Sequence, residues 1–512
     1  STPMTLPRLS ADLLRDRGEA VPDLPVRAVQ FGTGALLRGL VDDALDQAAR
    51  AGDWSGSAVV VSQTGSGRGA AFNEQDGLFT LRVRGIEGGE PVDEARVVGA
   101  VARALSAQDD WDAVLALARD PAVDLVVSNT TEVGLTWDDS DDPEAAPPAS
   151  FPAKLAAVLK ARLDALGPEA DLVVLPTELV EGNGDVLRDL VLRWGARAGW
   201  GEPFAAFVGA CRFANTLVDR IVTGTPPDLP AAEAAVGHRD PLMTDTEVYR
   251  LWAIEGDGAL RDRLGFATGD ASSGAGIVVA GDIEPFRLRK VRLLNAAHTL
   301  LVPVALGCGL ATVREAVTDD RLGAYVRGLM ADELVPAVAS DLDAMGAEPA
   351  TAAPFAAAVL DRFANPFIRH ELASITLQQT MKLGVRAVPS VAALDREGRS
   401  ADAIALGFAA FLLLHRAADG LPAGDSPLEF TTTRLLTDDR AEAVRARWRH
   451  RPDGAEAVAR DVLADAALWG RDLTALPRSG SAFADAVARL TARALDDGLP
   501  AVVDAHLALA TR

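Results

Sequence analysis

The first half of the chain alternates short hydrophobic runs with segments of helical periodicity. The run VRAVQF precedes a glycine turn and a helix with apolar positions at Leu36, Leu40, Val41 and Leu45. Three further runs follow, SAVVVSQ (57–63), VDLVVSNTT (123–131) and DLVVLPTEL (171–179), the second of them after the helix WDAVLALARD. Continuous hydrophobic runs separated by helices are typical of parallel strands covered on both faces. The pattern predicts an α/β fold with an N-terminal Rossmann-type, doubly wound parallel sheet.

The pattern changes near residue 283. From there to the end it consists of long Ala-, Leu-, Val-, Arg- and Asp-rich helical segments that break at Gly and Pro. The 512 residues also exceed the roughly 250 to 300 at which one core usually divides. We therefore expect a dinucleotide-binding domain over 1–280 and a mostly α-helical C-terminal domain over 281–512, the boundary falling near GDASSGAGIVVAGDIEP. The acidic, proline-rich segment WDDSDDPEAAPPASFP is predicted to be an exposed loop.

Composition narrows the possible partners. The formal net charge is −23 and no long stripe of arginine is present, which argues against a nucleic-acid partner. No hydrophobic run reaches the roughly 18 residues of a membrane span, and the first residues lack an apolar signal core. The two cysteines, Cys211 and Cys308, cannot build a multi-cysteine zinc site. We expect a cytoplasmic protein with no membrane or metal partner; the sequence leaves the oligomeric state open.

The segment QFGTGALLRG contains a candidate dinucleotide turn. Gly32 and Gly34 would let the backbone approach a pyrophosphate at the positive end of the following helix. The third glycine of the usual motif is replaced by Leu37, so a plain strand-turn-helix junction is the competing interpretation. Arg38, one turn into the helix, could reach a phosphate or the substrate, or could serve as a surface or ion-paired residue. The segment therefore matches the Rossmann dinucleotide turn in two of its three glycines.

The next strand ends in SQTGSGRG, without the acidic residue that binds a ribose 2′-hydroxyl. Arg68 in this segment could tolerate a 2′-phosphate. Local chemistry therefore leaves NAD and NADP open.

The stretch KVRLLNAAHTLLVPVALGCGLATVREAV, residues 290–317, reads as one helix that is apolar over most of its surface. At roughly 100° per residue, Lys290 lies at 0°, Asn295 near 140° and His298 near 80°, so all three share less than half of the circumference. They can converge on one small polar substrate. The alternative is that the three residues have only structural roles: a lysine in solvent at the helix end, a capped core asparagine and a hydrogen-bonded core histidine.

The same helix suggests an acid/base mechanism. Arg287, Arg289 and Arg292 would surround Lys290 with positive charge, which together with burial disfavours its ammonium form and favours a lysine that accepts a proton from an alcohol. Asn295 could stabilise the developing alkoxide, and His298 could bond to the same oxygen or its neighbour. The only tyrosines, Tyr249 and Tyr325, do not begin a YxxxK pair, which excludes the short-chain tyrosine mechanism.

The segment FANTLVDRIVTGTP places Asn215, Asp219 and Arg220 within two turns. Such an acid-arginine neighbour pair fits a structural ion pair that fixes a loop or domain seam. It also fits a carboxylate near the active site.

Together the KxxxxNxxH pattern of Lys290, Asn295 and His298 and the block LVDRIV resemble the polyol-specific long-chain dehydrogenases, the mannitol dehydrogenase family. The resemblance extends over most of the chain in eight ordered blocks: QFGTGALLRG, NEQDGLFTLRVRG, SNTTEVGLTW, FPAKLAAVL, ELVEGNGDVL, FANTLVDRIVTG, EPFRLRKVRLLNAAHT and ANPFIRHELASITLQQTMKLGVRAVPS. It implies a Rossmann-type domain, a helical C-terminal domain, and zinc-independent, NAD-linked reduction of a keto-uronate to an aldonate, the tagaturonate/altronate pair, with NADP not excluded. Lys290 would be the general acid/base, while Asn295 and His298 orient the oxygen.

The resemblance also implies binding residues. Asp219, Lys382 and Asn183 match substrate positions. The residues that match cofactor positions are Phe31, Gly32, Gly34, Leu36, Arg38, Asn129, Thr130 and Glu132.

Departures from the mannitol branch concern the substrate side. Leu179 stands where the mannitol enzymes carry an oxyanion asparagine, Ser374 where they carry a substrate arginine, and Ala35 where an asparagine is usual. These differences argue against mannitol itself and leave the exact uronate open. Dehydrogenases of mannonate, mannitol or arabinitol remain alternatives, as does a non-catalytic nucleotide-binding protein.

Overall fold

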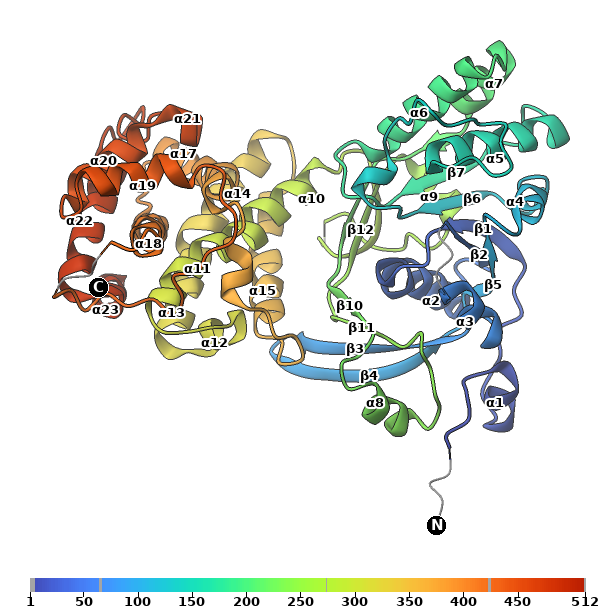
Figure 1. The fold of residues 1–512 in the computed structure, drawn as a ribbon, viewed down its shortest axis with the longest axis horizontal. Coiled ribbons are helices and arrows are strands. Elements are labelled where there is room, and N and C mark those ends of the chain that lie inside the picture. Colours follow the sequence, from blue (N-terminus) through green and yellow to red (C-terminus); the bar gives the residue numbers. More distant parts are fainter. Residues whose placement is uncertain (1–4, 64–66, 273, 422–424, 511–512) are drawn as a thin grey trace. The chain divides into compact units, whose positions relative to one another are not determined.

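The computed structural model describes residues 5–63, 67–272, 274–421 and 425–510. The chain forms two compact units. The N-terminal unit comprises Ser1–Arg84 and Pro91–Ile283, and the C-terminal unit comprises Gly85–Glu90 and Glu284–Arg512 (Figure 1).

The predicted parallel sheet is confirmed as the centre of the N-terminal unit. Its six strands follow the order β5-β2-β1-β6-β7-β8, and each neighbouring pair is parallel. The strands are β1 (Val26–Phe31), β2 (Ser57–Ser62), β5 (Val101–Ser106), β6 (Leu125–Ser128), β7 (Val173–Pro176) and β8 (Arg212–Phe213). Because the order reverses direction between β1 and β6, the carboxyl ends of these two strands form the switch point at which such sheets bind ligands.

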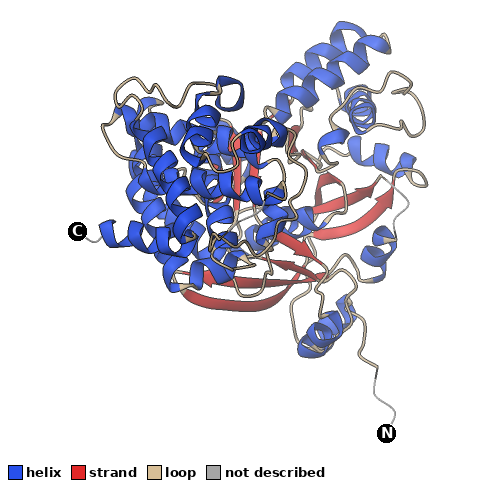
Figure 2. Cartoon of the chain, turned by 60° about the vertical axis from the view of Figure 1, so that its left-hand side comes forward, coloured by secondary structure: helices blue, strands red, loops and turns tan. Residues whose placement is uncertain are grey.

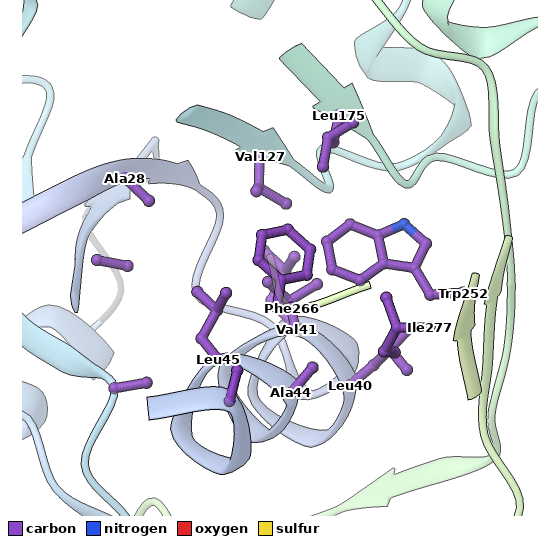
Figure 3. Close-up of a cluster of buried hydrophobic side chains, with 14 of the residues drawn as sticks. Ala28, Leu40, Val41, Ala44, Leu45, Val127, Leu175, Trp252, Phe266 and Ile277 are labelled. Atoms are coloured by element: carbon purple, nitrogen blue, oxygen red, sulfur yellow. The ribbon is translucent and has the colours of Figure 1, made fainter. Parts of the chain in front are cut away.

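Helices cover both faces of this sheet. On one face η1 (Leu37–Asp42) and α2 (Asp43–Ala51) pack on Ala28 and Val60, together with Trp252 and Phe266 (Figure 3). On the other face α4 (Trp111–Ala118), α5 (Phe151–Leu166), α6 (Asn183–Arg197) and α7 (Gly201–Ala210) pack on Val29 and Val59. Successive strand residues therefore enter opposite cores, which is why the strands read as continuous hydrophobic runs.

Two smaller sheets complete the N-terminal unit, and the hydrophobic pattern did not predict them. One has the order β10-β11-β3-β4 and the other the order β13-β12-β9. Their strands are β3 (Phe79–Glu87), β4 (Glu90–Val98), β9 (Thr216–Asp219), β10 (Val222–Gly224), β11 (Thr244–Thr246), β12 (Leu251–Glu255) and β13 (Gly276–Ala280). The β4 sequence EPVDEARVV is largely exposed and charged, so it lacks the signal of a buried strand. The remaining helices of this unit are α1 (Ala11–Asp16), α3 (Arg68–Glu74), η2 (Glu132–Gly134), α8 (Leu229–Val236) and α9 (Gly258–Leu264).

The C-terminal unit is helical, as predicted (Figure 2). Its first elements are α10 (Glu284–Arg289), η3 (Lys290–Asn295), α11 (Ala296–Gly307), α12 (Val313–Thr318), α13 (Asp320–Gly328), η4 (Leu329–Leu334), α14 (Val335–Ala344), η5 (Pro349–Thr351), α15 (Ala352–Phe363) and η6 (Leu372–Thr376). They are followed by α16 (Gln379–Arg386), α17 (Val388–Arg396), α18 (Asp402–Ala418), α19 (Ala441–His450), α20 (Ala455–Ala464), α21 (Ala466–Trp469), α22 (Ala482–Asp497) and α23 (Leu499–Ala510). Helix α18 is buried from Ala403 to Arg416 and packs on α11 and α22, as expected of a helix that is apolar all round.

The expected single helix over 290–317 is wrong in its bounds. Its first six residues form the π-turn η3, and α11 ends at Gly307. Gly309 then adopts a left-handed conformation, with φ of 83°, and Thr312 caps a separate helix, α12.

Candidate functional site

The first predicted cofactor residues lie where β1 meets β6. The backbone N–H of Asn129 donates to the carbonyl of Phe31 at 3.0 Å, which joins the two strand ends. Gly32 follows with φ of 123°, and a Cβ placed there would lie 2.6 Å from the carbonyl oxygen of Asn129. Only glycine combines this backbone conformation with such a close approach. Gly32 is thus required by the fold at the switch point.

The second glycine differs from the first. A Cβ at Gly34 would meet no atom of the described residues within 4 Å, so the backbone there is not crowded by them. The helix starts directly after it, at Ala35, and turns into the π-turn η1. A glycine at a helix N-terminus lets a pyrophosphate approach the free backbone N–H groups of the first turn. Phe31, which is buried, and Leu36, which packs at the edge of the core, support this turn from within.

Arg38, for which a phosphate contact was predicted, bonds to protein groups around the same turn. Its guanidinium is buried, donating to the carbonyl of Thr33 at 2.5 Å and to Thr244 Oγ1 at 3.0 Å. Burial, followed by the charge of Arg68, lowers the pKa of Arg38 to about 10. The geometry makes Arg38 a positioning residue that fixes the backbone between the two glycines.

The loop after β6 carries three of the predicted cofactor residues and is held by one that the sequence interpretation missed. Glu178, buried beyond β7, accepts hydrogen bonds from Ser128 Oγ (3.1 Å) and from the backbone N–H (3.1 Å) and hydroxyl (3.0 Å) of Thr130. Burial raises its pKa. Asn129 Nδ2 donates to Thr177 Oγ1 at 3.0 Å. The ends of β1, β6 and β7 are therefore linked in one hydrogen-bonded row.

The loop continues with a strained residue. Thr131 adopts φ of 66°, a region that a β-branched residue rarely occupies and that is concentrated at functional sites. Glu132 begins the short turn η2, and its side chain lies outside the described residues.

Replacing Glu178 by Ala should destabilise this row. Three donors would lose their acceptor inside the protein, so we expect a loss of unfolding free energy of about 1–3 kcal/mol and a raised KM for the dinucleotide. Glu178→Gln keeps one acceptor oxygen and should retain part of both. Urea unfolding and cofactor titration measure the two effects, and an unchanged cofactor affinity in Glu178→Ala would contradict the assigned role.

Asn183 has a different place from the predicted substrate contact. Its amide nitrogen donates to the carbonyls of Pro176, Glu178 and Thr216, and its oxygen accepts from the N–H groups of Gly184 and Thr216. The side chain is buried, with 1% exposed. These bonds place Asn183 in the frame that joins β7 to β9, and its substrate role stays a prediction.

The neighbouring block LVDRIV divides into two roles. Arg220 is buried, and its partner is not the adjacent acid: it donates to Asp43 Oδ2 at 2.9 Å and to the carbonyls of Gly39 and Glu247. This agrees with the structural alternative for the arginine. Asp219 ends β9 and is 6% exposed. Its substrate role stays a prediction.

In the C-terminal unit the π-turn η3 runs from Lys290 to Asn295, two of the predicted catalytic residues. A π-turn closes through i→i+5 hydrogen bonds and recurs at functional sites. Since it holds more residues per turn than an α-helix, Asn295 lies closer in direction to Lys290 than the roughly 140° of a regular helix. The turn brings the two side chains toward one side, and His298 follows in the first turn of α11.

Two of the three arginines that were predicted to crowd Lys290 have carboxylate partners. Arg287 pairs with Glu284, and Arg292 donates to Asp341 Oδ2 at 2.7 Å. A carboxylate thus offsets each of these charges. Arg289 is buried beneath Phe286 and donates to Thr351 Oγ1 at 2.8 Å.

His298 lies in an unusual environment. Its ring stacks on Phe363 with centroids 4.1 Å apart and meets the ring of His370 edge-on at 5.2 Å. Its Nε2 is buried without a hydrogen-bond partner among the described residues. Burial, then the positive groups His370, Arg362, Arg386 and Lys382, lowers the pKa of His298 well below its ordinary range. A neutral imidazole with an unsatisfied buried nitrogen is prepared to bond to a ligand oxygen.

This environment predicts an acid-sensitive fold. Above the ordinary histidine pKa of ~6.5 both the folded and the unfolded chain hold a neutral His298, whereas below it only the unfolded chain takes up the proton. His298 alone should therefore lower the stability by up to about 1.4 kcal/mol per pH unit as the pH falls below ~6.5. We expect His298→Gln to flatten the pH dependence of urea unfolding between about pH 7.5 and 5.5. The exposed His450→Gln should leave the slope unchanged, and an equal slope in both variants would contradict the account.

The predicted substrate residue Lys382 belongs to α16 and is half-buried. Its Nζ donates to the carbonyl of Ile375 at 3.0 Å, and burial, then Arg386, lowers its pKa. Ser374, nearby in η6, donates to the carbonyl of Glu371.

No group of three or more His, Cys, Asp or Glu side chains in the part of the chain that the structure describes could hold a metal ion. None of the helices there is long and apolar enough to cross a membrane.

Comparison with known proteins covers both units. The Mannitol dehydrogenase Rossmann domain matches residues 26–266, and the Mannitol dehydrogenase C-terminal domain matches residues 282–491. The altronate oxidoreductase of Bacillus subtilis (strain 168) is 34% identical over 459 residues, which cover 89% of this chain and 90% of the relative. The altronate oxidoreductase of Yersinia enterocolitica is 35% identical over 497 residues, which cover 94% and 97%.

Solved structures share the fold. A D-sorbitol dehydrogenase in substrate-free form aligns with a TM-score of 0.74 at 22% identity, over 97% of this chain and 100% of that one. The Pseudomonas fluorescens mannitol 2-dehydrogenase, in a ternary complex with NAD and D-mannitol, aligns with a TM-score of 0.62 at 22% identity, over 98% and 99%. Three observations indicate the same family: the two domain matches span most of the sequence, the relatives are more than 30% identical, and the parallel sheet has the expected strand order. The chain belongs to the mannitol dehydrogenase family.

Proposed function

We propose that the protein is an NAD-linked oxidoreductase that interconverts a keto-uronate and an aldonate, the tagaturonate/altronate pair. The observation that carries the proposal is the Nε2 of neutral His298, which is buried and has no hydrogen-bond partner in the described part of the chain, one turn beyond the π-turn that bears Lys290 and Asn295. A buried polar nitrogen without a partner calls for one, and a substrate oxygen supplies it. The similarity to altronate oxidoreductases over about nine-tenths of the chain supports the choice of sugar acid.

The switch point of the N-terminal unit fits a dinucleotide. Gly32 and Gly34 would admit the pyrophosphate at the start of the helix at Ala35, and Asn129 and Thr130 would border the nicotinamide half from the next strand end. NAD(H), when bound, supplies or accepts the hydride. NAD is the cofactor that we propose, which agrees with the NAD found in the mannitol 2-dehydrogenase complex; Arg68, exposed at the start of α3, keeps NADP as an outcome to be measured.

The residues of the C-terminal unit handle the proton. In the reductive direction Lys290 donates a proton to the carbonyl oxygen as the carbonyl carbon receives a hydride, and the product is a secondary alcohol. In the oxidative direction Lys290 takes this proton back. Asn295 donates its amide N–H to the same oxygen while negative charge develops on it, and His298 fixes the oxygen or the neighbouring hydroxyl. Lys382 and Asp219 bind the rest of the substrate.

A substrate panel tests this proposal. Reduced nicotinamide consumption is followed by its near-ultraviolet absorbance with NADH or NADPH and with tagaturonate, fructuronate, fructose or xylulose. We expect the highest kcat/KM for NADH with tagaturonate. A preference for fructose or xylulose would move the assignment to a polyol dehydrogenase, and no turnover with any of the four would overturn the proposed reaction.

A further inference from the structure

Two cations on α16 face the helix that carries the predicted catalytic residues. Helix α16 packs against both η3 and α11, and Lys382 and Arg386 lie one turn apart on it. Neither side chain has a carboxylate within ion-pair distance among the described residues. Their printed partners are neutral: the carbonyl of Ile375 for Lys382 and the hydroxyl of Thr299 for Arg386.

Thr299 connects Arg386 to the catalytic helix. Its hydroxyl donates to the carbonyl of Asn295 at 2.9 Å and accepts a hydrogen bond from Arg386 Nη1 at 3.1 Å. Thr299 is itself buried, with 1% exposed, and follows His298 directly. One nitrogen of the guanidinium is thereby fixed beside the catalytic residues. The other N–H groups of this planar fork find no acceptor in the described parts of the protein.

Other arginines of this unit show what is missing at Arg386. Arg292 pairs with Asp341 at 2.7 Å, Arg447 pairs with Asp465 at 2.8 Å, and Arg449 pairs with Asp419 at 2.8 Å. Arg386 is half-buried like Arg447, yet burial lowers its pKa and no carboxylate among the described residues offsets the effect. A half-buried guanidinium without a counter-charge is costly unless an anion arrives.

We propose that Arg386, anchored by Thr299, binds the carboxylate of the substrate with Lys382 as the second cation, and so selects sugar acids over neutral sugars. This inference rests on the proposed function, because it assigns a residue to the acid group of the proposed substrate. A guanidinium offers a carboxylate two parallel N–H donors, and an ammonium one turn away adds charge without fixing orientation.

The test compares Arg386→Gln with the wild-type enzyme. Binding of altronate is measured by calorimetry in the presence of NADH, and kcat and KM are measured with tagaturonate. We expect altronate affinity to fall roughly 10- to 100-fold, the scale of one charge-assisted hydrogen-bonded pair, with the loss appearing in KM more than in kcat. Arg386→Lys should recover part of the affinity, and the affinity of a neutral alditol such as mannitol should stay unchanged.

Two further variants separate this role from a general loss of structure. Arg449→Gln removes an exposed arginine of the same unit and should bind altronate like the wild type. Thr299→Val keeps the guanidinium but removes its anchor, and should raise the KM for tagaturonate by less than Arg386→Gln does. Wild-type altronate affinity in both Arg386→Gln and Thr299→Val would overturn the inference, as would an equal loss for mannitol and altronate. An inactive wild-type enzyme would instead overturn the proposed function.

Discussion

Replacing Lys290 by Ala should lower turnover by roughly 10²-fold or more, the usual scale for loss of a general acid or base. Lys290 opens the π-turn that ends at Asn295, so its ammonium is the group expected to exchange a proton with the reacting oxygen. NADH affinity should be unchanged, since the proposed dinucleotide site is built from the N-terminal unit. Initial rates with tagaturonate and fluorescence titration with NADH measure the two quantities.

Lys160 offers a matched control for this variant. It pairs with Asp164 within α5 of the N-terminal unit, and it does not belong to the loops that follow β1 and β6. Lys160→Ala should keep wild-type turnover. A fully active Lys290→Ala enzyme would remove the lysine from the mechanism, and a variant that lost NADH binding as well would point to a structural role.

The second large effect concerns the two glycines after β1. Alanine at Gly32 would have to adopt φ of 123° and approach the carbonyl of Asn129 to 2.6 Å, so Gly32→Ala should lose at least about 1–3 kcal/mol of unfolding free energy. The methyl group of an alanine at Gly34 would meet no atom within 4 Å in the part of the chain that the structure describes, so this variant should fold with nearly wild-type stability. It should nonetheless weaken NADH binding by roughly 10-fold or more, because the methyl group occupies the approach to the pyrophosphate.

Urea unfolding and NADH titration of both variants distinguish the two roles. The expected result is a stability defect in Gly32→Ala and a binding defect without a stability defect in Gly34→Ala. Wild-type NADH affinity in Gly34→Ala would contradict the assignment of this turn to the cofactor.

The parts of the fold that sequence reasoning predicted are those with a local signal. The parallel strands are hydrophobic along their whole length, and the turn at Gly32 is marked by its residue type. The charged β4 carries no such signal, and the sheets containing β9 and β12 depend on pairings between distant segments. The π-turn also escaped prediction, because its sequence KVRLLN does not differ in periodicity from an α-helix over one turn.

The site residues divide in the same manner. The spacing of Lys290, Asn295 and His298 is a property of one helix, so they could be grouped from the sequence. The partners of Arg38 and Asn183 are Thr244 and Thr216, which are remote in sequence, so nothing local showed that both side chains are occupied. Glu178 could have been found, since an acid just beyond the carboxyl end of a parallel strand lies at the ligand edge of the sheet.

The central claim is that a hydride passes between nicotinamide and the keto carbon of a sugar acid. It is tested most directly by incubating the enzyme with tagaturonate and NADH deuterated at the transferring position of nicotinamide C4, followed by mass spectrometry of the product. The account predicts altronate with one deuterium on the new carbinol carbon and oxidised nicotinamide in equal amount. The account would be contradicted if folded enzyme that binds NADH left both the tagaturonate and the NADH unconsumed, with no deuterium in the sugar acid.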